Sequence, residues 1–238
     1  MEPKAYLDEK LAEYYENEGE IGEEKTLFRR KDNGDRLIVQ RLPAEADLAV
    51  YARLLGVQND RVARVYDIVE SPEAVFVLLE YVEGKSLAEV LDATLPEKKT
   101  VRRIARDVCD GLCQLHALGI AHKDLKPENV VLDAEGRARL IDLNIATVFD
   151  EGRRNKTAVL GTVGYAAPEQ FGFSRTDART DIYAYGVLLN LLLTRVHPTV
   201  KLYRKGRYGR VLKKCLAISP ADRYENAMAL KRGLSVFG

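Results

Sequence analysis

Residues 122–129 read His-Lys-Asp-Leu-Lys-Pro-Glu-Asn, and residues 140–144 read Leu-Ile-Asp-Leu-Asn. The stretches at residues 129–132 and 138–141 consist mostly of apolar residues and predict two short strands around a turn at residues 134–136. A solvated loop is the ordinary explanation for polar residues beside such strands. The two polar stretches must therefore be weighed together with the residues that follow them in the chain.

Two further stretches follow, Gly161-Thr-Val-Gly-Tyr165 and Ala167-Pro-Glu169. The four stretches resemble, in order and spacing, the catalytic loop, the metal-binding motif and the end of the activation segment of eukaryotic-like serine/threonine protein kinases. One such motif can arise by chance, but an ordered set favours membership of the family. The resemblance covers roughly the whole chain and is strongest from residue 75 onward.

The resemblance implies an α+β, bilobed protein-kinase-like fold with a small N-terminal β-rich lobe and a larger α-helical C-terminal lobe. The element order agrees, because strand patterns come first and helix patterns second. We expect one domain over residues 1–238, with an N-lobe at about 1–82, a hinge at about 80–84 and a C-lobe at about 85–238.

Hydrophobic patterning predicts the main elements of both lobes. In the first lobe we expect a turn at residues 32–35, strands at 37–39, 61–69 and 74–82, and one helix at 44–55. In the second lobe we expect helices at 86–91, 100–118 and 181–193. The apolar positions of the long helix are Val101, Ile104, Val108, Leu112 and Leu115.

The family's catalytic roles map onto four residues of the first two stretches. Asp124 matches the residue that accepts or orients the proton of the substrate hydroxyl, and Lys126 matches the residue that reaches the transferred phosphoryl group. Asn129 also belongs to this catalytic set. Asn129 and Asp142 match the ligands of Mg²⁺, which prefers hard oxygen donors.

Further matches have structural roles in the family. Glu169 and Arg223 resemble a buried ion pair, and Asp181 resembles a carboxylate that accepts backbone N–H bonds from the catalytic loop. Thr162 matches a threonine that contacts the catalytic aspartate and lysine. His122 is expected to pack beneath the site, as is Leu143.

The first lobe departs from the family pattern. Gly22 stands alone where the family has a loop with three glycines, and Glu23 and Glu24 follow it. Gln40 occupies the position of the lysine that binds phosphate, and Ile38 replaces a small residue over the adenine. These changes put nucleotide binding by the usual contacts in doubt.

Lys25 offers a replacement cation. The run Lys25-Thr-Leu-Phe-Arg29 is similar to the with-no-lysine kinases, in which a lysine of the second strand takes over. An ordinary solvated strand lysine is the alternative. The matching carboxylate would be Glu45 or Asp47 on the first-lobe helix, and Arg41 should face away from Gln40.

ATP and Mg²⁺ are the cofactors that the resemblance implies. The expected nucleotide-binding residues are Gly22, Lys25, Leu27, Ile38, Glu80, Val82 and Val131. The implied function is transfer of the ATP γ-phosphate to a serine or threonine hydroxyl of a protein. The alternatives are a pseudokinase that acts as a scaffold or allosteric partner, and a small-molecule kinase, which the peptide-docking residues 161–169 argue against. If the activation loop is phosphorylated, we expect Thr157 in preference to Thr162, with Lys123 as the partner of the phosphate.

Composition limits the remaining classes of function. A net charge of +1 gives no global field for nucleic acid or membranes, and no apolar run is long enough to cross a bilayer. The start of the chain lacks a signal peptide pattern, so we expect a cytoplasmic protein or a cytoplasmic portion of a longer one. Three cysteines make a poor disulfide framework, and Cys109 and Cys113 fit a helix core.

A basic stretch at residues 201–214 reads KLYRKGRYGRVLKK. A solvated helix face is its simplest explanation. A docking site for an acidic or phosphorylated partner is the alternative, and nucleic acid is not expected. It lies where the family carries a substrate-docking helix, which looks truncated here.

Overall fold

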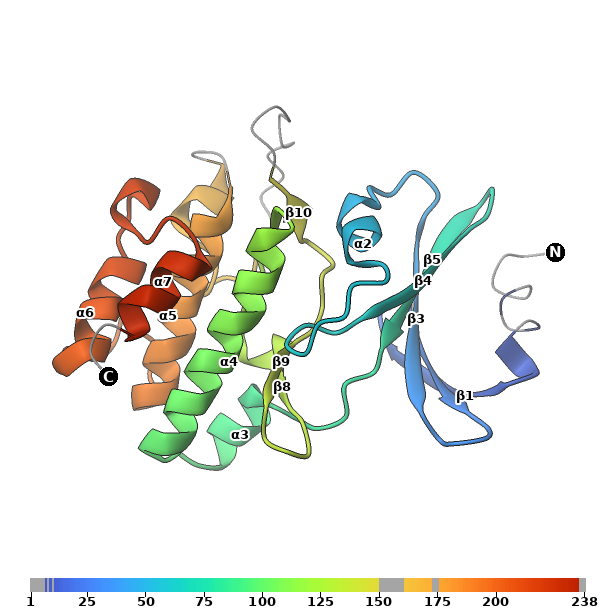
Figure 1. The fold of residues 1–238 in the computed structure, drawn as a ribbon, viewed down its shortest axis with the longest axis horizontal. Coiled ribbons are helices and arrows are strands. Elements are labelled where there is room, and N and C mark those ends of the chain that lie inside the picture. The colour runs from blue at the N-terminus through green and yellow to red at the C-terminus, as the bar shows by residue number, and fades with distance from the viewer. Residues whose placement is uncertain (1–6, 8, 10, 150–160, 173–175, 236–238) are drawn as a thin grey trace. The chain divides into compact units, whose positions relative to one another are not determined.

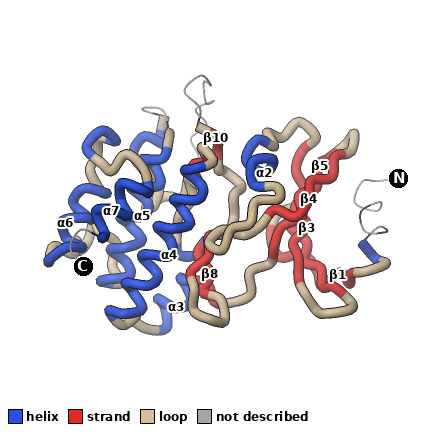
Figure 2. Tube along the Cα trace, in the orientation of Figure 1, coloured by secondary structure: helices blue, strands red, loops and turns tan. Residues whose placement is uncertain are grey.

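The computed structural model describes most of the chain (Figure 1), namely residues 7, 9, 11–149, 161–172 and 176–235. The chain forms two compact units. The N-terminal unit comprises residues 1–59 and 63–82, and the C-terminal unit comprises residues 60–62 and 83–238. Figure 2 shows strands in the first unit and mainly helices in the second, so the predicted α+β fold is confirmed.

One antiparallel sheet, with strand order β1-β2-β3-β5-β4, builds the N-terminal unit. Its strands are β1 (Tyr15–Gly22), β2 (Lys25–Arg30), β3 (Arg36–Pro43), β4 (Val65–Glu70) and β5 (Ala74–Glu80). The predicted turn joins β2 to β3, and its Gly34 has a φ of 78°, a conformation that costs glycine little.

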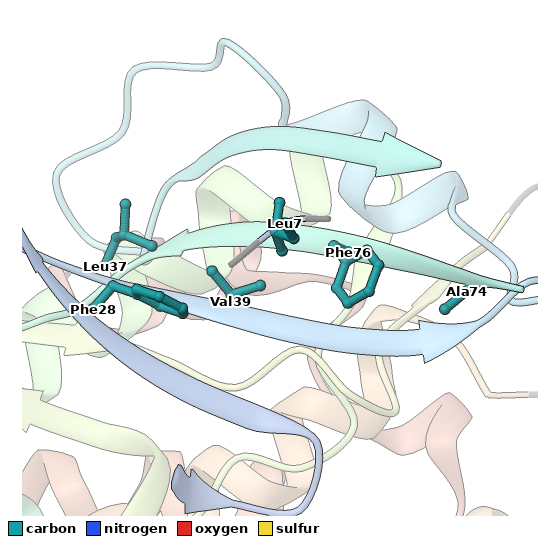
Figure 3. Close-up of a cluster of buried hydrophobic side chains, with 6 residues drawn as sticks. All are labelled: Leu7, Phe28, Leu37, Val39, Ala74 and Phe76. Atoms are coloured by element: carbon teal, nitrogen blue, oxygen red, sulfur yellow. The ribbon is translucent and has the colours of Figure 1, made fainter. Parts of the chain in front are cut away.

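An apolar cluster covers one face of this sheet (Figure 3). Its buried members are Leu7, Phe28, Leu37, Val39, Ala74 and Phe76. Successive side chains of a strand point to opposite faces. Since Leu37 and Val39 enter the cluster, Ile38 and Gln40 must lie on the other face of the sheet.

The helix of the N-terminal unit is shorter than the sequence predicted. We expected a helix over residues 44–55, but α2 spans Ala49–Leu54. The side chain of Asp47 accepts a hydrogen bond of 3.0 Å from the backbone N–H of Ala49. Such local bonds compete with helical ones, which explains the late start of α2.

The strand expected at residues 61–69 also begins later, at Val65. Residues 60–62 belong to the C-terminal unit instead. There the carbonyl of Arg61 accepts a hydrogen bond of 2.7 Å from the backbone N–H of Leu140. The hydrophobic periodicity of the sequence did not predict that Arg61 would bond to Leu140 of the C-terminal unit.

Helices dominate the described part of the C-terminal unit. They are α3 (Leu87–Ala93), α4 (Lys98–Ala117), α5 (Ala178–Thr194), α6 (Gly206–Cys215) and α7 (Ala227–Ser235). Short 3-10 helices are η1 (Pro127–Asn129), η2 (Pro168–Phe171) and η3 (Pro220–Asp222). Two small sheets pair β6 (Lys85–Ser86) with β8 (Val130–Leu132) and β9 (Ala138–Leu140), and β7 (Ile120–Ala121) with β10 (Thr147–Val148).

The long helix α4 forms the centre of the C-terminal unit, where α5 and α7 pack against it (Figure 1). Its predicted apolar stripe is confirmed, because all five positions are at most 3% exposed. Cys109 is buried beside this stripe as expected, whereas Cys113 is only half-buried. No helix in the described part of the chain is both long and apolar enough to span a membrane.

Close packing of α5 against α6 depends on Gly186. A Cβ atom at this position would lie 2.7 Å from Cβ of Cys215, closer than real contacts allow. Glycine therefore lets the two helices approach.

A buried ion pair joins η2 to the chain after α6. Arg223 contacts both carboxylate oxygens of Glu169, at 2.7 and 3.0 Å, and both side chains are at most 2% exposed. Arg223 also donates to the carbonyls of Ala217, Arg179 and Ile218, and Thr180 donates to Glu169. The predicted pair is thus confirmed, with every strong donor and acceptor occupied.

We predict that Arg223→Met lowers the free energy of unfolding by about 3–5 kcal/mol, because it leaves the buried Glu169 carboxylate without its counter-charge. The double variant Glu169→Leu/Arg223→Met should be less destabilised than Arg223→Met. Urea denaturation monitored by circular dichroism measures both. A double variant that is less stable than the single variant would contradict the account.

Candidate active site in the C-terminal unit

The β8–β9 hairpin brings the two polar stretches together. Val130 pairs with Leu140, and the backbone N–H of Ile141 donates to the carbonyl of Asn129 at 3.0 Å. Asn129 comes directly before β8, and Asp142 comes two residues after β9. Because the strands are antiparallel, both residues lie at the same end of the hairpin.

A hydrogen-bonded cluster surrounds Asp124. Thr162 donates its hydroxyl to one carboxylate oxygen at 2.7 Å, and Lys126 approaches the other oxygen at 3.1 Å. Lys126 also donates to the Thr162 hydroxyl at 2.9 Å. The amide of Asn129 donates to the carboxylate and to the carbonyl of Asp124, at 2.9 and 2.8 Å. The expected contact of Thr162 with the catalytic pair is therefore present.

These bonds keep Asp124 ionised. Partial burial by itself would raise the pKa of the carboxyl, but the hydrogen bonds from Thr162 and Lys126 and the charge of Lys126 outweigh it. The pKa of Asp124 consequently lies below its ordinary value. At neutral pH the side chain is a proton acceptor.

Asp181 of α5 holds the backbone of the same loop. Its carboxylate accepts hydrogen bonds from the backbone N–H groups of His122 and Lys123, at 2.9 and 2.8 Å. Lys123 has a φ of 67°, which is unfavourable for a residue with a side chain. The predicted role of Asp181 is confirmed, and its bonds compensate for this backbone strain.

His116 of α4 completes this anchor, and the sequence reasoning missed it. Its Nδ1 accepts a hydrogen bond from the backbone N–H of Ala227, so its Nε2–H donates to Asp181 at 2.9 Å. Complete burial would raise the pKa of Asp181, but the bond from His116 and the loop N–H groups hold it below the ordinary value. The sequence signal was a histidine in the last turn of α4.

Two packing residues lie where they were expected. His122 is fully buried and Leu143 is 7% exposed. Gln170 was not foreseen: its amide donates to the carbonyl of Lys123 at 2.9 Å and so ties η2 to the loop. Its position beside Glu169 gave the only hint.

In the N-terminal unit, Lys25 of β2 pairs in register with Gln40 of β3. The next pair on this face is Leu27 with Ile38. Directly opposed residues have Cβ atoms about 4.5–5.5 Å apart, so Lys25 and Gln40 are immediate neighbours on one face of the sheet. Gln40 is only 4% exposed, whereas the next residue, Arg41, is exposed.

A tight turn at Glu23 and Glu24 joins β1 to β2. Gly22 pairs with Lys25, and Glu24 adopts a left-handed φ of 56°. The carboxylate of Glu24 forms an ion pair with Arg41 at 3.3 Å. Glu24, one of the two carboxylates of the turn, is thus paired with a cation of β3.

Comparison with known proteins agrees with this geometry. Residues 25–232 match the family described as Protein kinase domain. The chain belongs to the protein kinase family. Its named relatives place it in the eukaryotic-like serine/threonine branch.

Bacterial kinases are among the most similar relatives. The chain is 33% identical to serine/threonine-protein kinase pkn2 of Myxococcus xanthus over 73% of its length and 22% of that protein. It is 31% identical to PrkC of Bacillus subtilis, over 67% of the chain and 24% of that kinase. It is 34% identical to PknL of Mycobacterium tuberculosis, over 68% of the chain and 40% of that kinase. The chain therefore spans well under half the length of these relatives.

One detail of this kinase domain corrects the sequence prediction. Glu45 and Asp47, the candidate partners for the anchoring lysine, precede α2 and do not lie on it. The helix residue that reaches Gln40 is Tyr51, whose hydroxyl lies 3.5 Å from the amide oxygen. At the position of the family's lysine, Gln40 therefore contacts a neutral side chain of α2.

The remaining nucleotide positions stay predictions. The side chain of Glu80 accepts a hydrogen bond from the backbone N–H of Arg64 at 3.0 Å. Val82 ends the N-terminal unit, and Val131 lies on β8 with 7% exposure. Thr157, the preferred phosphorylation site, lies outside the described residues.

We predict that Thr162→Ala raises the pKa of Asp124, because it removes a hydrogen bond that favours the ionised form. A depressed pKa keeps the carboxylate ionised down to lower pH, so its loss moves the acid limb of the rate profile to higher pH. The measurement is kcat/KM for phosphotransfer from about pH 3 upward, because the acid limb of a carboxyl with a depressed pKa lies below the ordinary aspartate value of about 3.9. An unchanged acid limb in Thr162→Ala, with Thr162→Ser as the control, would contradict the assignment.

Proposed function

We propose that this chain is a serine/threonine protein kinase that transfers the γ-phosphate of ATP to a protein hydroxyl with Mg²⁺. The observation that carries the proposal is the connected cluster of Asp124, Lys126, Asn129 and Thr162. A solvated loop has no reason to hold an ionised carboxylate among three directed donors. Phosphoryl transfer needs this kind of positioning and charge neutralisation.

Each residue of the cluster has a defined task in this reaction. Asp124 accepts or orients the proton of the attacking hydroxyl, since its low pKa keeps it ionised. Lys126 offers a positive charge to the transferred phosphoryl group. Thr162 holds both side chains in place from the end of the activation segment.

Asn129 and Asp142 suit a magnesium site. The amide nitrogen of Asn129 is committed to Asp124, which leaves its oxygen as the ligand atom. The described residues contain no group of three or more acidic, histidine or cysteine side chains able to hold a metal. Mg²⁺ commonly takes only one or two protein ligands and completes its shell with water and phosphate oxygens, so the set fits. When bound, Mg²⁺ neutralises charge on the phosphates.

A phosphotransfer assay tests the function directly. The protein is incubated with Mg²⁺, labelled ATP and a generic serine/threonine substrate, beside the variant Asp124→Asn. We expect incorporation to fall by about 10²–10⁴-fold in the variant. Equal incorporation by both proteins, or none by the wild type, would contradict the proposal.

Lys25 is the best replacement for the missing phosphate-binding lysine. The register places it directly opposite Gln40, on the face that carries Leu27 and Ile38. Arg41, the next residue of β3, points to the other face of the sheet and forms an ion pair with Glu24. Two metal ligands and Lys126 leave charge on the α- and β-phosphates to be compensated, and Lys25 is the neighbouring cation.

We predict that Lys25→Met abolishes phosphotransfer and that Gln40→Ala has a much smaller effect. Steady-state kinetics with thermal unfolding as a fold check measure both. The double variant Lys25→Met/Gln40→Lys moves the cation to the opposing strand position and should restore part of the activity. Wild-type activity in Lys25→Met would remove Lys25 from the mechanism.

A pseudokinase is the second candidate. The contact between Gln40 and Tyr51, in place of an ion pair, and the branched side chain of Ile38 favour it. Under this alternative the domain acts as a scaffold or allosteric partner. Nucleotide-dependent thermal stabilisation that persists in Asp142→Ala and without Mg²⁺, with no phosphotransfer, would favour the pseudokinase.

The substrate class and location belong to the same proposal. A protein substrate fits the segment from Gly161 to Glu169, which resembles the peptide-docking surface of protein kinases. A cytoplasmic location fits the three free cysteines, because thiols persist in reducing compartments.

A further inference from the structure

A cavity of about 300 Å³ lies among α4, α6 and α7 in the C-terminal unit. Ala105 and Cys109 of α4 line it, and both are nearly fully buried. Around these small side chains stand four cations: Arg102 and Arg106 of α4, Arg207 of α6 and Lys231 of α7. The cavity is built from helices rather than from the loops of the catalytic cluster.

The positive charge of this cavity is only partly balanced. Lys231 forms an ion pair with Asp110 at 2.6 Å. Within the described part of the chain, none of the three arginines forms an ion pair with a carboxylate within 4.0 Å. Arg102 and Arg106 are one helical turn apart, so they project from the same face of α4. Like charges gathered in a concave site raise the local affinity for an anion.

The remaining polar lining comes from Tyr208 and Ser235. Tyr208 of α6 lines the cavity with the guanidinium of Arg207 5.4 Å from the centre of its ring. Ser235 at the end of α7 also lines the cavity, and its hydroxyl donates to the carbonyl of Lys231 at 2.8 Å. The guanidinium groups and the Tyr208 hydroxyl suit the oxygen atoms of a phosphate group, and arginine can bind two of them at once.

Size and surroundings limit the occupant. Ligand cavities commonly measure about 300–1,000 Å³, so this one lies at the small end. It suits a single phosphorylated side chain. Directly before α6, the exposed residues Arg204 and Lys205 extend the positive surface beyond the cavity. Acidic residues that flank the phosphate in a peptide would meet this extension.

We propose that the cavity among α4, α6 and α7 binds a phosphoserine or phosphothreonine side chain within an acidic segment of a partner protein. The phosphate contacts Arg102, Arg106, Arg207 and Lys231, and the flanking carboxylates contact the basic stretch before α6. This assigns the stretch at residues 201–214 a docking role. Phosphate binding in this cavity does not require catalysis by the chain, so the proposal holds whether the domain is a kinase or a pseudokinase.

Fluorescence anisotropy with the full chain tests the site. The probe is a labelled peptide with one phosphothreonine among glutamates, and the unphosphorylated peptide is its control. We expect Arg106→Gln and Arg207→Gln each to weaken phosphopeptide binding by about tenfold. Arg103→Gln and Arg232→Gln remove the same charge from neighbouring exposed positions outside the cavity, so each should change the affinity by less than about twofold.

Three outcomes would overturn the proposal. Equal losses in the cavity variants and the matched controls would indicate general charge attraction. Equal affinity for the unphosphorylated peptide would show that phosphate is not recognised. Competition by inorganic phosphate or a sugar phosphate at the concentration of the phosphopeptide would assign the cavity to a small molecule instead. Unchanged phosphotransfer to a generic substrate in Arg106→Gln is also expected, since Arg106 lines the cavity and takes no part in the hydrogen bonds around Asp124.

Discussion

The buried carboxylate of Asp181 fixes the backbone of the loop that begins at His122, and the arrangement of the cluster around Asp124 depends on it. It accepts two successive backbone N–H bonds from the catalytic loop while Lys123 is held at a left-handed φ. His116 supplies the third bond, and its other ring nitrogen is fixed by the start of α7. Three helices thereby define the path of one loop. Without a charged acceptor at this point, two buried N–H groups would lose their partner and the loop could relax.

The geometry of the cluster around Asp124 depends on this anchor. Because the loop backbone is fixed, Asp124 can collect donors from Lys126, Asn129 and Thr162. The bond from Gln170 to the loop and the ion pair between Glu169 and Arg223 brace η2 from the other side. Hydrogen bonds and ion pairs therefore connect Asp181, the cluster around Asp124 and the Glu169–Arg223 pair within the C-terminal unit.

Sequence patterns located this system because its parts are local. The stretch from His122 to Asn129 occupies eight positions, and the stripe of α4 repeats with the period of a helix. The incorrect predictions of element boundaries also had local causes. The hydrogen bond to the Asp47 side chain shifted the start of α2 to a later residue, and Arg61 bonded to β9 instead of continuing a strand. Once α2 began at Ala49, neither Glu45 nor Asp47 was on the helix, and Tyr51 took the place beside Gln40.

The sequence by itself determined the family, the order of the elements and the stretch from His122 to Asn129 that forms the loop around Asp124, since these depend on short-range spacing and periodicity. Tertiary structure alone decided which distant residues meet. The register between β2 and β3 set Lys25 opposite Gln40, and helix packing gathered cations from α4, α6 and α7 around one cavity. Neither arrangement can be obtained from spacing, because strand register and helix contacts are fixed by the burial of the whole core.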